Sequence, residues 1–501
     1  MPSHHQKSAR NEQSMQKTQP VDLVSLARQT MIKYGFEPDF SADVFRETEI
    51  SAHRDHTGAI SSVQDLRSLL WSSIDNSDSL DLDQIEYCEE KSGGVILVKV
   101  AIADVDVFVQ KDTAIDRHAA HNGTSVYTGV ETFPMLPDSL SKGVSSLLPG
   151  SDHPAVVIEY SVHPDGSFIP GSLYQALVSN KAKLVYEEIG DWLEGKSGVP
   201  ESVSAVSGLE QQLLLQNSAA QRLKEHRRRQ GALDLGTLEA TTVAEKGLVL
   251  DLIIQEQNMA RCLIEEFMVA ANGTTVHFLN HAKMPMIQRI VRTPKNWEGI
   301  RMTAAQFREK LPRTPDVKAL ARFLKHRRDA DPERFPDLSL TIVKLMGPGE
   351  YVPFIPGEPP IGHFALAVTD YTHGTAPNRR YVDLIIQRII KSVLSGKSTP
   401  YSATDLTRLA SWLTSREKGS KKVERFMEKA AAAVLLQRRI GDLFNGLITG
   451  ASEKGTYVRI MNPPVEGRVI KGCKGLYVGQ KVRVRLIHAD PQTAFIDFDC
   501  T

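Results

Sequence analysis

Alternation of apolar and polar residues predicts strands in the first part of the chain. Ser92-Gly93-Gly94 separates two of the alternating segments, and a Gly-Gly turn between strands is typical of a β-hairpin. A second pair of alternating segments follows some 50 residues later. The predicted strands are residues 69–74, 85–90, 95–104, 156–162 and 172–178.

Apolar residues at helical spacing predict several helices elsewhere in the chain. The clearest ends with Arg227, Arg228 and Arg229 before Gly231, where basic residues complement the helix dipole and glycine suits the C-terminal cap. A solvated helix end is the commoner explanation of such a basic run, and phosphate binding is the other. The predicted helices cover residues 21–34, 209–230, 260–279, 304–328 (one or two helices), 382–394 and 421–443.

The C-terminal segment changes character, because short strands follow one another with Gly and Pro between them. Five strands in about 60 residues are typical of an OB barrel. Residues 443–501 hold eight Lys and Arg against five Asp and Glu, so this segment is basic although the chain is neutral. Tyr457, Tyr477 and Phe495 are candidates for base stacking, with barrel-core packing as the alternative. The predicted strands are residues 444–449, 456–461, 465–470, 482–488 and 494–498.

The composition is that of an ordinary globular protein, with 501 residues, 41% hydrophobic and 24% charged. This length predicts two or three domains. The formal net charge is zero, so nucleic-acid binding has to come from local basic patches. The four cysteines form no CxxC pair, which favours reduced thiols over a zinc site. The reduced thiols favour a cytoplasmic location. No apolar run approaches the roughly 20 residues of a membrane span, so we predict no membrane association.

An acidic stretch lies between two predicted strands. Asp75, Asp78, Asp81 and Asp83 fall within nine residues, with no Lys or Arg among them. Carboxylates brought this close repel one another, and a hard divalent cation with oxygen ligands offsets that repulsion. An acidic surface loop whose Asp and Ser residues cap a turn is the other interpretation. The spacing alone does not separate the two.

Two adjacent arginines, Arg379 and Arg380, precede the apolar helix predicted over 382–394. Such a position is normally packed, and Arg is favoured there when it binds a phosphate or carboxylate in a bidentate manner. A structural ion pair with one of the many carboxylates of the chain is the alternative.

Six motifs that occur in the same order together resemble the ribonuclease II / ribonuclease R family, whose catalytic module is the RNB domain. The resemblance spans roughly residues 62–440. The family's IDxxxxxDxDD pattern matches residues 74–84, and its GHFGLxxxxYTHFTSPIRRYxDL pattern is similar to residues 362–384. The further matching segments are residues 100–105, 124–127 with 134–141, 180–188 and 263–272.

The resemblance implies an α+β fold, with an RNB catalytic domain followed by a small C-terminal OB-type β-barrel. In that domain a mixed sheet with surrounding helices would enclose an RNA channel. It also implies a hydrolytic 3′-to-5′ exoribonuclease that uses Mg²⁺, acts on single-stranded RNA and releases nucleoside 5′-monophosphates. We expect domains over residues 61–442 and 443–501, after a disordered tail (1–20) and a partly helical segment (21–60). We expect a monomer.

The resemblance also implies roles for individual residues. The metal ligands would be Asp75, Asp81, Asp83 and Gln84, with Asp83 as the carboxylate most needed for the chemistry. Arg379 would act in catalysis by binding the scissile phosphate, which stabilises charge in the transition state. The remaining substrate-binding residues would be Tyr127, stacked on the base at the RNA 3′ end, and Arg380.

Some positions depart from the family pattern. Gln84 stands where the family has a fourth metal-site aspartate, so the site loses one negative charge. Gln437 stands where the family often has a glutamate that assists catalysis. Leu235 replaces a frequent aromatic residue. About 60 residues precede the catalytic module, fewer than the two cold-shock barrels of typical members need, so we expect a short form without them.

Two functional hypotheses follow. The first is an active Mg²⁺-dependent exoribonuclease, which the presence of Asp83, Tyr127 and Arg379 favours. The second is a catalytically weak or inactive RNA-binding protein of the same fold, which Gln84 and Gln437 favour because both lose a carboxylate. A metal-binding structural protein that does not bind RNA would leave Tyr127, Arg379 and the barrel unexplained.

Overall fold

The computed structural model describes residues 21–53, 63–236, 239–359, 361–452, 455–472 and 474–501. The predicted disordered tail (1–20) and the end of the predicted N-terminal segment (54–60) lie outside these residues. Within the described residues, no helix is both long enough and apolar enough to cross a bilayer.

A seven-stranded mixed sheet forms the centre of the fold, with strand order β1-β8-β7-β4-β3-β2-β9. Two neighbouring pairs, β1 with β8 and β2 with β9, are parallel, and the other pairs are antiparallel. The strands predicted from alternation are all confirmed, with shifts of a few residues at their ends. The sheet strands are β1 (Gln64–Asp65), β2 (Ser72–Asp75), β3 (Gln84–Glu90), β4 (Ile96–Ala103), β7 (Asp152–Val162), β8 (Phe168–Ser179) and β9 (Ala182–Val185).

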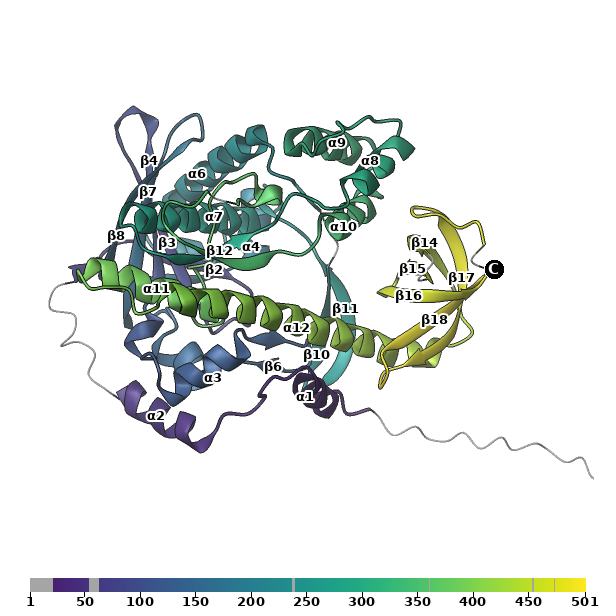
Figure 1. The fold of residues 1–501 in the computed structure, drawn as a ribbon, viewed down its shortest axis with the longest axis horizontal. Coiled ribbons are helices and arrows are strands. Elements are labelled where there is room, and N and C mark those ends of the chain that lie inside the picture. The colour runs from purple at the N-terminus through teal and green to yellow at the C-terminus, as the bar shows by residue number, and fades with distance from the viewer. Residues whose placement is uncertain (1–20, 54–62, 237–238, 360, 453–454, 473) are drawn as a thin grey trace, which may run out of the picture.

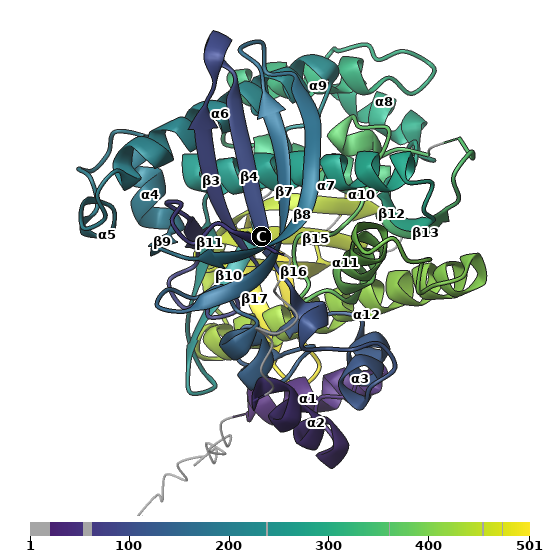
Figure 2. The ribbon, with the colours of Figure 1, turned by 90° about the vertical axis from the view of Figure 1, so that its left-hand side faces the viewer.

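Helices α6 (Leu209–Gln230) and α7 (Met259–His281) cover one face of this sheet, behind the strands in Figure 2. α6 is polar apart from a buried face that includes Leu213, Ala220 and Leu223, whereas α7 is rich in buried apolar residues. The Tyr160 hydroxyl of β7 donates a hydrogen bond to the Phe267 carbonyl of α7. α6 ends at Gly231, whose φ of 102° is the left-handed conformation expected of a glycine cap. The basic end of α6 is structural, because Arg227 pairs with Glu265 and Glu266 of α7.

The longest helix, α12 (Ala403–Leu436), runs from the sheet to the C-terminal barrel (Figure 1). The prediction of a helix over 421–443 was wrong at both ends. The helix begins 18 residues earlier, at a capping box in which Ser402 and Asp405 satisfy each other's backbone N–H groups. Leu406, Ala410 and Leu413 are buried at helical spacing in this first part, so the pattern was present in the sequence and the prediction overlooked it.

The C-terminal strands close into a barrel in the order β14-β15-β16-β18-β17, as the sequence predicted. Val458, Leu486 and Phe498 are buried in its core. Tyr477 and Phe495 are exposed, so neither is a core residue of the barrel. The strands are β14 (Leu443–Ser452), β15 (Gly455–Met461), β16 (Pro464–Lys471), β17 (Lys481–Asp490) and β18 (Phe495–Cys500).

The remaining elements surround the sheet and connect it to the barrel. The stretch predicted as one or two helices over 304–328 contains the end of α8 and most of α9, which pack with α10 around a separate apolar cluster. The helices are α1 (Leu23–Lys33), α2 (Ala42–His53), α3 (Ala114–Asn122), α4 (Tyr186–Leu193), α5 (Glu201–Ser204), α8 (Trp297–Gln306), α9 (Val317–Ala330), α10 (Phe335–Met346) and α11 (Tyr381–Leu394). The short strands are β5 (Val126–Tyr127), β6 (Thr132–Phe133), β10 (Glu239–Glu245), β11 (Leu248–Gln255), β12 (Met286–Ile290) and β13 (Glu350–Phe354).

Candidate active site

The acidic stretch forms the loop between β2 and β3. Asp75 ends β2, and its Oδ1 accepts hydrogen bonds from the Asn76 backbone N–H and the Ser79 hydroxyl, both at 2.8 Å. These local bonds turn the chain sharply after the strand, as Asp and Ser do in many turns. Asp78 is exposed in this loop, and Asp81 is half-buried. These bonds support the turn interpretation for Asp75. They occupy only Oδ1, so they do not exclude Oδ2 as a metal ligand.

Asp83 joins this loop to the segment before α11. Its side chain is 2% exposed. The Asn378 backbone N–H donates to Oδ1 at 2.9 Å, and Arg379 Nε donates to Oδ2 at 3.0 Å. Residues nearly 300 positions apart thus meet at one carboxylate. Because Arg379 uses Nε for this bond and its side chain is 41% exposed, the Nη end of its fork is left to face an anion.

The local electrostatics make the carboxylates of this loop unusually basic. Burial raises the pKa of Asp83 to about 7, although Arg379 and the Asn378 N–H act in the opposite direction. Burial also raises the pKa of Asp81, and the neighbouring Asp75 carboxylate adds to this shift. Carboxylates with raised pKa values gain most from a nearby cation, because the cation stabilises their charged form.

Tyr127 lies at the edge of the same loop. It is in β5, its residue surface is 43% exposed, and its hydroxyl donates to Asp81 Oδ2 at 3.4 Å. The Ser125 backbone N–H and the Thr124 hydroxyl both donate to the Arg379 carbonyl, at 3.0 and 3.1 Å. The backbone of Arg379 therefore fixes the segment that carries Tyr127, which places an exposed aromatic ring beside the acidic loop.

Arg380 makes an ion pair within its own helix turn. Its Nε and Nη2 atoms donate to the two oxygens of Asp383 at 2.9 and 2.8 Å. Asp383 also accepts from the Ala376 backbone N–H at 2.8 Å. The structural alternative raised for this arginine is thus present. Its predicted role in substrate binding stays a prediction.

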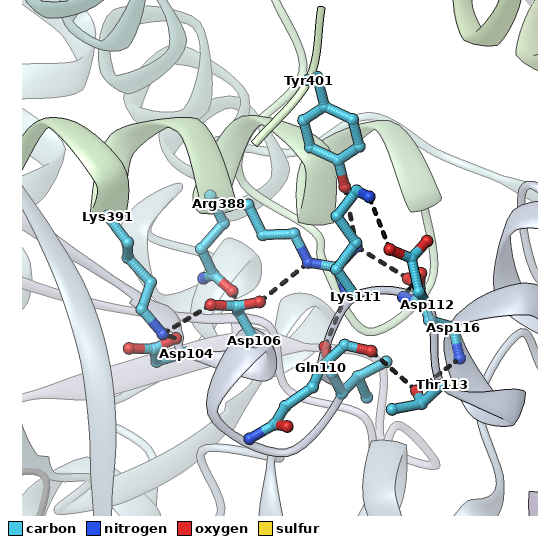
Figure 3. Close-up of polar contacts among 12 residues, drawn as sticks. Asp104, Asp106, Gln110, Lys111, Asp112, Thr113, Asp116, Arg388, Lys391 and Tyr401 are labelled. Carbon is cyan, nitrogen blue, oxygen red and sulfur yellow. Dashed lines mark hydrogen bonds and ion pairs between the residues drawn. The ribbon is translucent and has the colours of Figure 1, made fainter. Parts of the chain in front are cut away.

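A buried network holds α11, and with it Arg379, against the sheet (Figure 3). Arg388 donates to Asp106 through Nε and to Asp116 through Nη1, both at 2.8 Å. One turn further, Lys391 Nζ donates to Asp104 at 2.8 Å. Each of these carboxylates meets a cation, so the network anchors the second half of α11 to the segment that follows β4 and to α3.

The two glutamines that depart from the family pattern lie in different places. Gln84 is the first residue of β3, is 8% exposed, and lies opposite Ile102 of β4. Gln437 follows α12 in a short helical turn (Gln437–Arg439) that contacts β17 of the barrel. Of the two, Gln84 directly follows Asp83.

The oxygen donors of the loop fit a hard divalent cation by their chemistry. In the described part of the chain, no three Asp, Glu, His or Cys side chains converge into a ready metal-binding group. A cation would therefore have to draw the side chains of Asp75, Asp81 and Asp83 together. Each oxygen of Asp83 retains a further lone pair beside its one hydrogen bond, so that pairing does not exclude ligation.

Sequence reasoning missed Glu86. This residue lies on β3, is fully buried, and neither of its carboxylate oxygens has a hydrogen-bond partner among the described residues. The sequence held a signal for it, because Glu86 lies in phase with Gln84 and Cys88 on the buried face of the strand. It also missed Arg261, whose guanidinium lies 4.4 Å above the Tyr186 ring and bonds to Asn76 of the acidic loop.

Comparison with known proteins agrees with this architecture. The RNB domain family matches residues 63–396, and the RNase II-type exonuclease C-terminal S1 domain matches residues 442–500. Ribonuclease R of Thermotoga maritima is 30% identical over 467 residues, which cover 90% of this chain and 63% of that protein. Ribonuclease R of Escherichia coli is 30% identical over 422 residues, which cover 81% of this chain and 51% of that protein. The chain thus spans about half to two thirds of the length of these relatives.

Solved structures show the same fold. RNase R of Mycoplasma genitalium in complex with ribose methylated single-stranded RNA superposes with a TM-score of 0.86 at 22% identity, covering 96% of this chain and 78% of that chain. Yeast Ssd1, described as a pseudonuclease, superposes with a TM-score of 0.68 at 15% identity, covering 89% of this chain and 55% of that chain. Because the RNB match covers most of the chain and includes the acidic loop and Arg379, the chain belongs to the RNB domain family.

Proposed function

We propose that this protein is a Mg²⁺-dependent hydrolytic exoribonuclease that degrades single-stranded RNA from its 3′ end and releases nucleoside 5′-monophosphates. The observation that carries the proposal is the contact between Asp83 and Arg379. It brings a phosphate-binding side chain to a loop of carboxylates, and phosphodiester hydrolysis needs both. The name Ribonuclease R of the relatives supports the same activity.

Arg379 acts on the substrate phosphate in this proposal. Asp83 holds Nε of the guanidinium, which orients the remaining N–H groups toward one side. A phosphate oxygen bound there would gain charge in the transition state, and a fixed cation stabilises that charge without reorganising. Asp83 is thus a positioning residue for Arg379 and also a candidate ligand.

Asp75, Asp81, Asp83 and Gln84 are the residues proposed to hold the cation. A bound Mg²⁺ supplies Lewis-acid chemistry, since it makes water more acidic and neutralises charge on the leaving oxygen. The chain contributes oxygen donors around one loop and excludes bulk water from Asp83 by burial. The Tyr127 hydroxyl lies 3.4 Å from Asp81 Oδ2, so the tyrosine adjoins the carboxylates of this loop.

Substrate binding rests on the exposed aromatic residues. The Tyr127 ring is available to stack on the terminal base, which is a sequence-tolerant contact. The basic barrel with exposed Tyr477 and Phe495 would contact RNA further from its 3′ end. The RNA in the Mycoplasma genitalium complex supports this choice of ligand. A monomeric state and a cytoplasmic location stay predictions.

The second candidate is an RNA-binding protein of the same fold with weak or no catalysis. Gln84 favours it, because a neutral amide replaces a carboxylate next to Asp83. The pseudonuclease among the similar structures supports the point that this fold alone does not guarantee hydrolysis.

One experiment separates the two candidates. A 5′-labelled single-stranded RNA is incubated with the protein in Mg²⁺ or EDTA, alongside Asp83→Asn and the matched control Asp78→Asn in the exposed part of the loop. We expect a Mg²⁺-dependent ladder that Asp83→Asn abolishes and Asp78→Asn retains. RNA binding without a ladder in the wild type would exclude the exonuclease and leave the RNA-binding protein.

A further inference from the structure

Glu86 is a buried acid for which the described residues provide no hydrogen-bond partner. Its residue surface is 0% exposed, and both Oε1 and Oε2 lack a hydrogen bond within the described part of the chain. A buried carboxylate is normally paired with a cation or hydrogen-bonded, because an isolated charge loses its favourable hydration on burial. An unpaired one therefore calls for a ligand or a proton.

Glu86 lies on the same face of β3 as Gln84. The strand alternates, so residues two apart point to one side, and Gln84 and Glu86 oppose Ile102 and Val100 of β4. Gln84 is the position where the family pattern has an aspartate and this chain has a neutral amide. The missing negative charge is thus matched by a carboxylate one step along the same face.

The surroundings of Glu86 are acidic. Burial raises its pKa well above the usual value, and the Asp75 carboxylate raises it further. The pKa of Tyr186, at the start of α4, is raised first by burial and then by the Asp75 and Glu86 carboxylates. Ser72, directly across on β2, has a buried hydroxyl without a partner in the described structure. In addition to burial, Glu86 contributes to the raised pKa values of Cys88, Tyr160 and Tyr186, all of which are acids.

We propose that Glu86 supplies the divalent cation with the carboxylate that Gln84 lacks, acting together with Asp75. The inference rests on the proposed function, because it concerns the same cation. A cation between Asp75 and Glu86 would remove their repulsion and satisfy the unpaired oxygens of Glu86, and carboxylate oxygens are the ligands that Mg²⁺ prefers. The site would then hold Asp75, Asp81, Asp83 and Glu86, which restores four carboxylates.

A purely structural role is the competing explanation. A permanently protonated Glu86 could share its proton with Ser72 and never meet the cation. The two roles differ in what a neutral isostere does. Glu86→Gln would leave cation binding unchanged if Glu86 is structural, and would weaken it if Glu86 is a ligand.

The test measures Mn²⁺ binding to the full chain by isothermal titration calorimetry after removal of metal with EDTA. The variants are Glu86→Gln, Gln84→Asp and the double variant, with Glu89→Gln as the matched control. Glu89 lies on the opposite face of β3 and pairs with Lys91 at the surface. We expect Glu86→Gln to weaken binding about tenfold or more, the double variant to recover most of the loss, and Glu89→Gln to bind as the wild type does.

Unchanged Mn²⁺ binding in Glu86→Gln, with binding lost in Asp75→Asn, would overturn the inference and leave the proposed function standing. A wild type that binds no Mn²⁺ and yields no RNA ladder would remove both. If circular dichroism shows that Glu86→Gln does not fold, Gln84→Asp alone decides. It should change the affinity by less than about threefold when Glu86 already supplies the charge, and a gain of about tenfold or more would overturn the inference.

Discussion

Two regions of the molecule bury acidic side chains and treat their charge in opposite ways. Beside α11, Asp106 and Asp116 both meet Arg388, and Asp104 meets Lys391. This α11 network leaves none of its carboxylates without a cation. Such complete pairing is typical of an ion network with a structural role, because a buried charge is tolerated when its partners are present.

In the acidic loop and on β3, the acidic side chains are paired with cations less completely. Among Asp75, Asp81, Asp83 and Glu86, the described structure shows an ion pair only for Asp83, with Arg379. The Asp75 carboxylate contributes to the raised pKa of Asp81, and the oxygens of Glu86 have no hydrogen-bond partner in the described part of the chain. The α11 network thus neutralises its own carboxylates, whereas the acidic loop and β3 leave negative charge uncompensated among the described residues. This uncompensated charge is the basis of the proposed cation site.

The largest expected effect comes from breaking the α11 network. Arg388→Met removes the partner of two buried carboxylates and should lower the free energy of unfolding by about 3–5 kcal/mol, measured by denaturant titration. The control is Arg408→Met, whose exposed side chain lies near Asp405 and should cost less than about 0.5 kcal/mol. Equal effects of the two changes would mean that the α11 network is not structural.

The second-largest effect is expected on the rate of RNA hydrolysis when Arg379 is replaced, with the stability of the fold nearly unchanged. Arg379→Lys keeps a positive charge near Asp83 but loses the fork that would bind a phosphate. We expect kcat for RNA hydrolysis to fall about a hundredfold with little change in the melting temperature. Arg438→Lys, on the exposed turn after α12, serves as the control. A rate close to that of the wild type would remove Arg379 from the chemistry.

A smaller effect is expected at Tyr127. Replacing the ring by alanine removes a base-stacking surface and should raise KM for short single-stranded RNA by about tenfold. Tyr127→Phe keeps the ring and loses only the bond to Asp81, so its KM should stay within about twofold of the wild type. A larger loss in Tyr127→Phe than in Tyr127→Ala would assign the role of this residue to its hydroxyl.

The smallest effect is the pH dependence of stability without metal. The pKa of Asp83 is raised to about 7, against about 3.9 in an unfolded chain, so its contribution to stability is complete at about pH 4 and is lost as the pH rises to 7. Asp106 behaves oppositely, because Lys391 and Arg388 outweigh its burial and hold its pKa below the usual value. Its contribution is lost only as the pH falls below about 4.

Melting temperatures measured in EDTA should therefore decline by a few degrees between about pH 5 and 7. Asp83→Asn should remove part of this decline, since asparagine does not titrate. An identical slope in wild type and variant would contradict the raised pKa of Asp83.

Local sequence patterns were enough for most of the fold. Alternation predicted the central strands, and five short strands predicted the barrel, because these patterns reflect burial on one face. The long helix α12 was placed wrongly, since the buried positions of its first half include polar residues such as Arg416 and Ser420 beside few apolar ones. The hairpin of β10 and β11 and the helices α2 and α3 were not predicted, because short segments with mixed polarity leave only weak patterns.

The acidic loop and the arginine pair before the apolar helix could both be identified from sequence patterns alone. Only the tertiary structure decided between their competing interpretations, because it brought Asp83 to Arg379 and turned Arg380 toward Asp383. It also singled out Glu86, whose significance depends on burial and on the absence of partners within the described residues. Pairing between residues nearly 300 positions apart is set by the packing of α11 against the sheet, which no local pattern encodes.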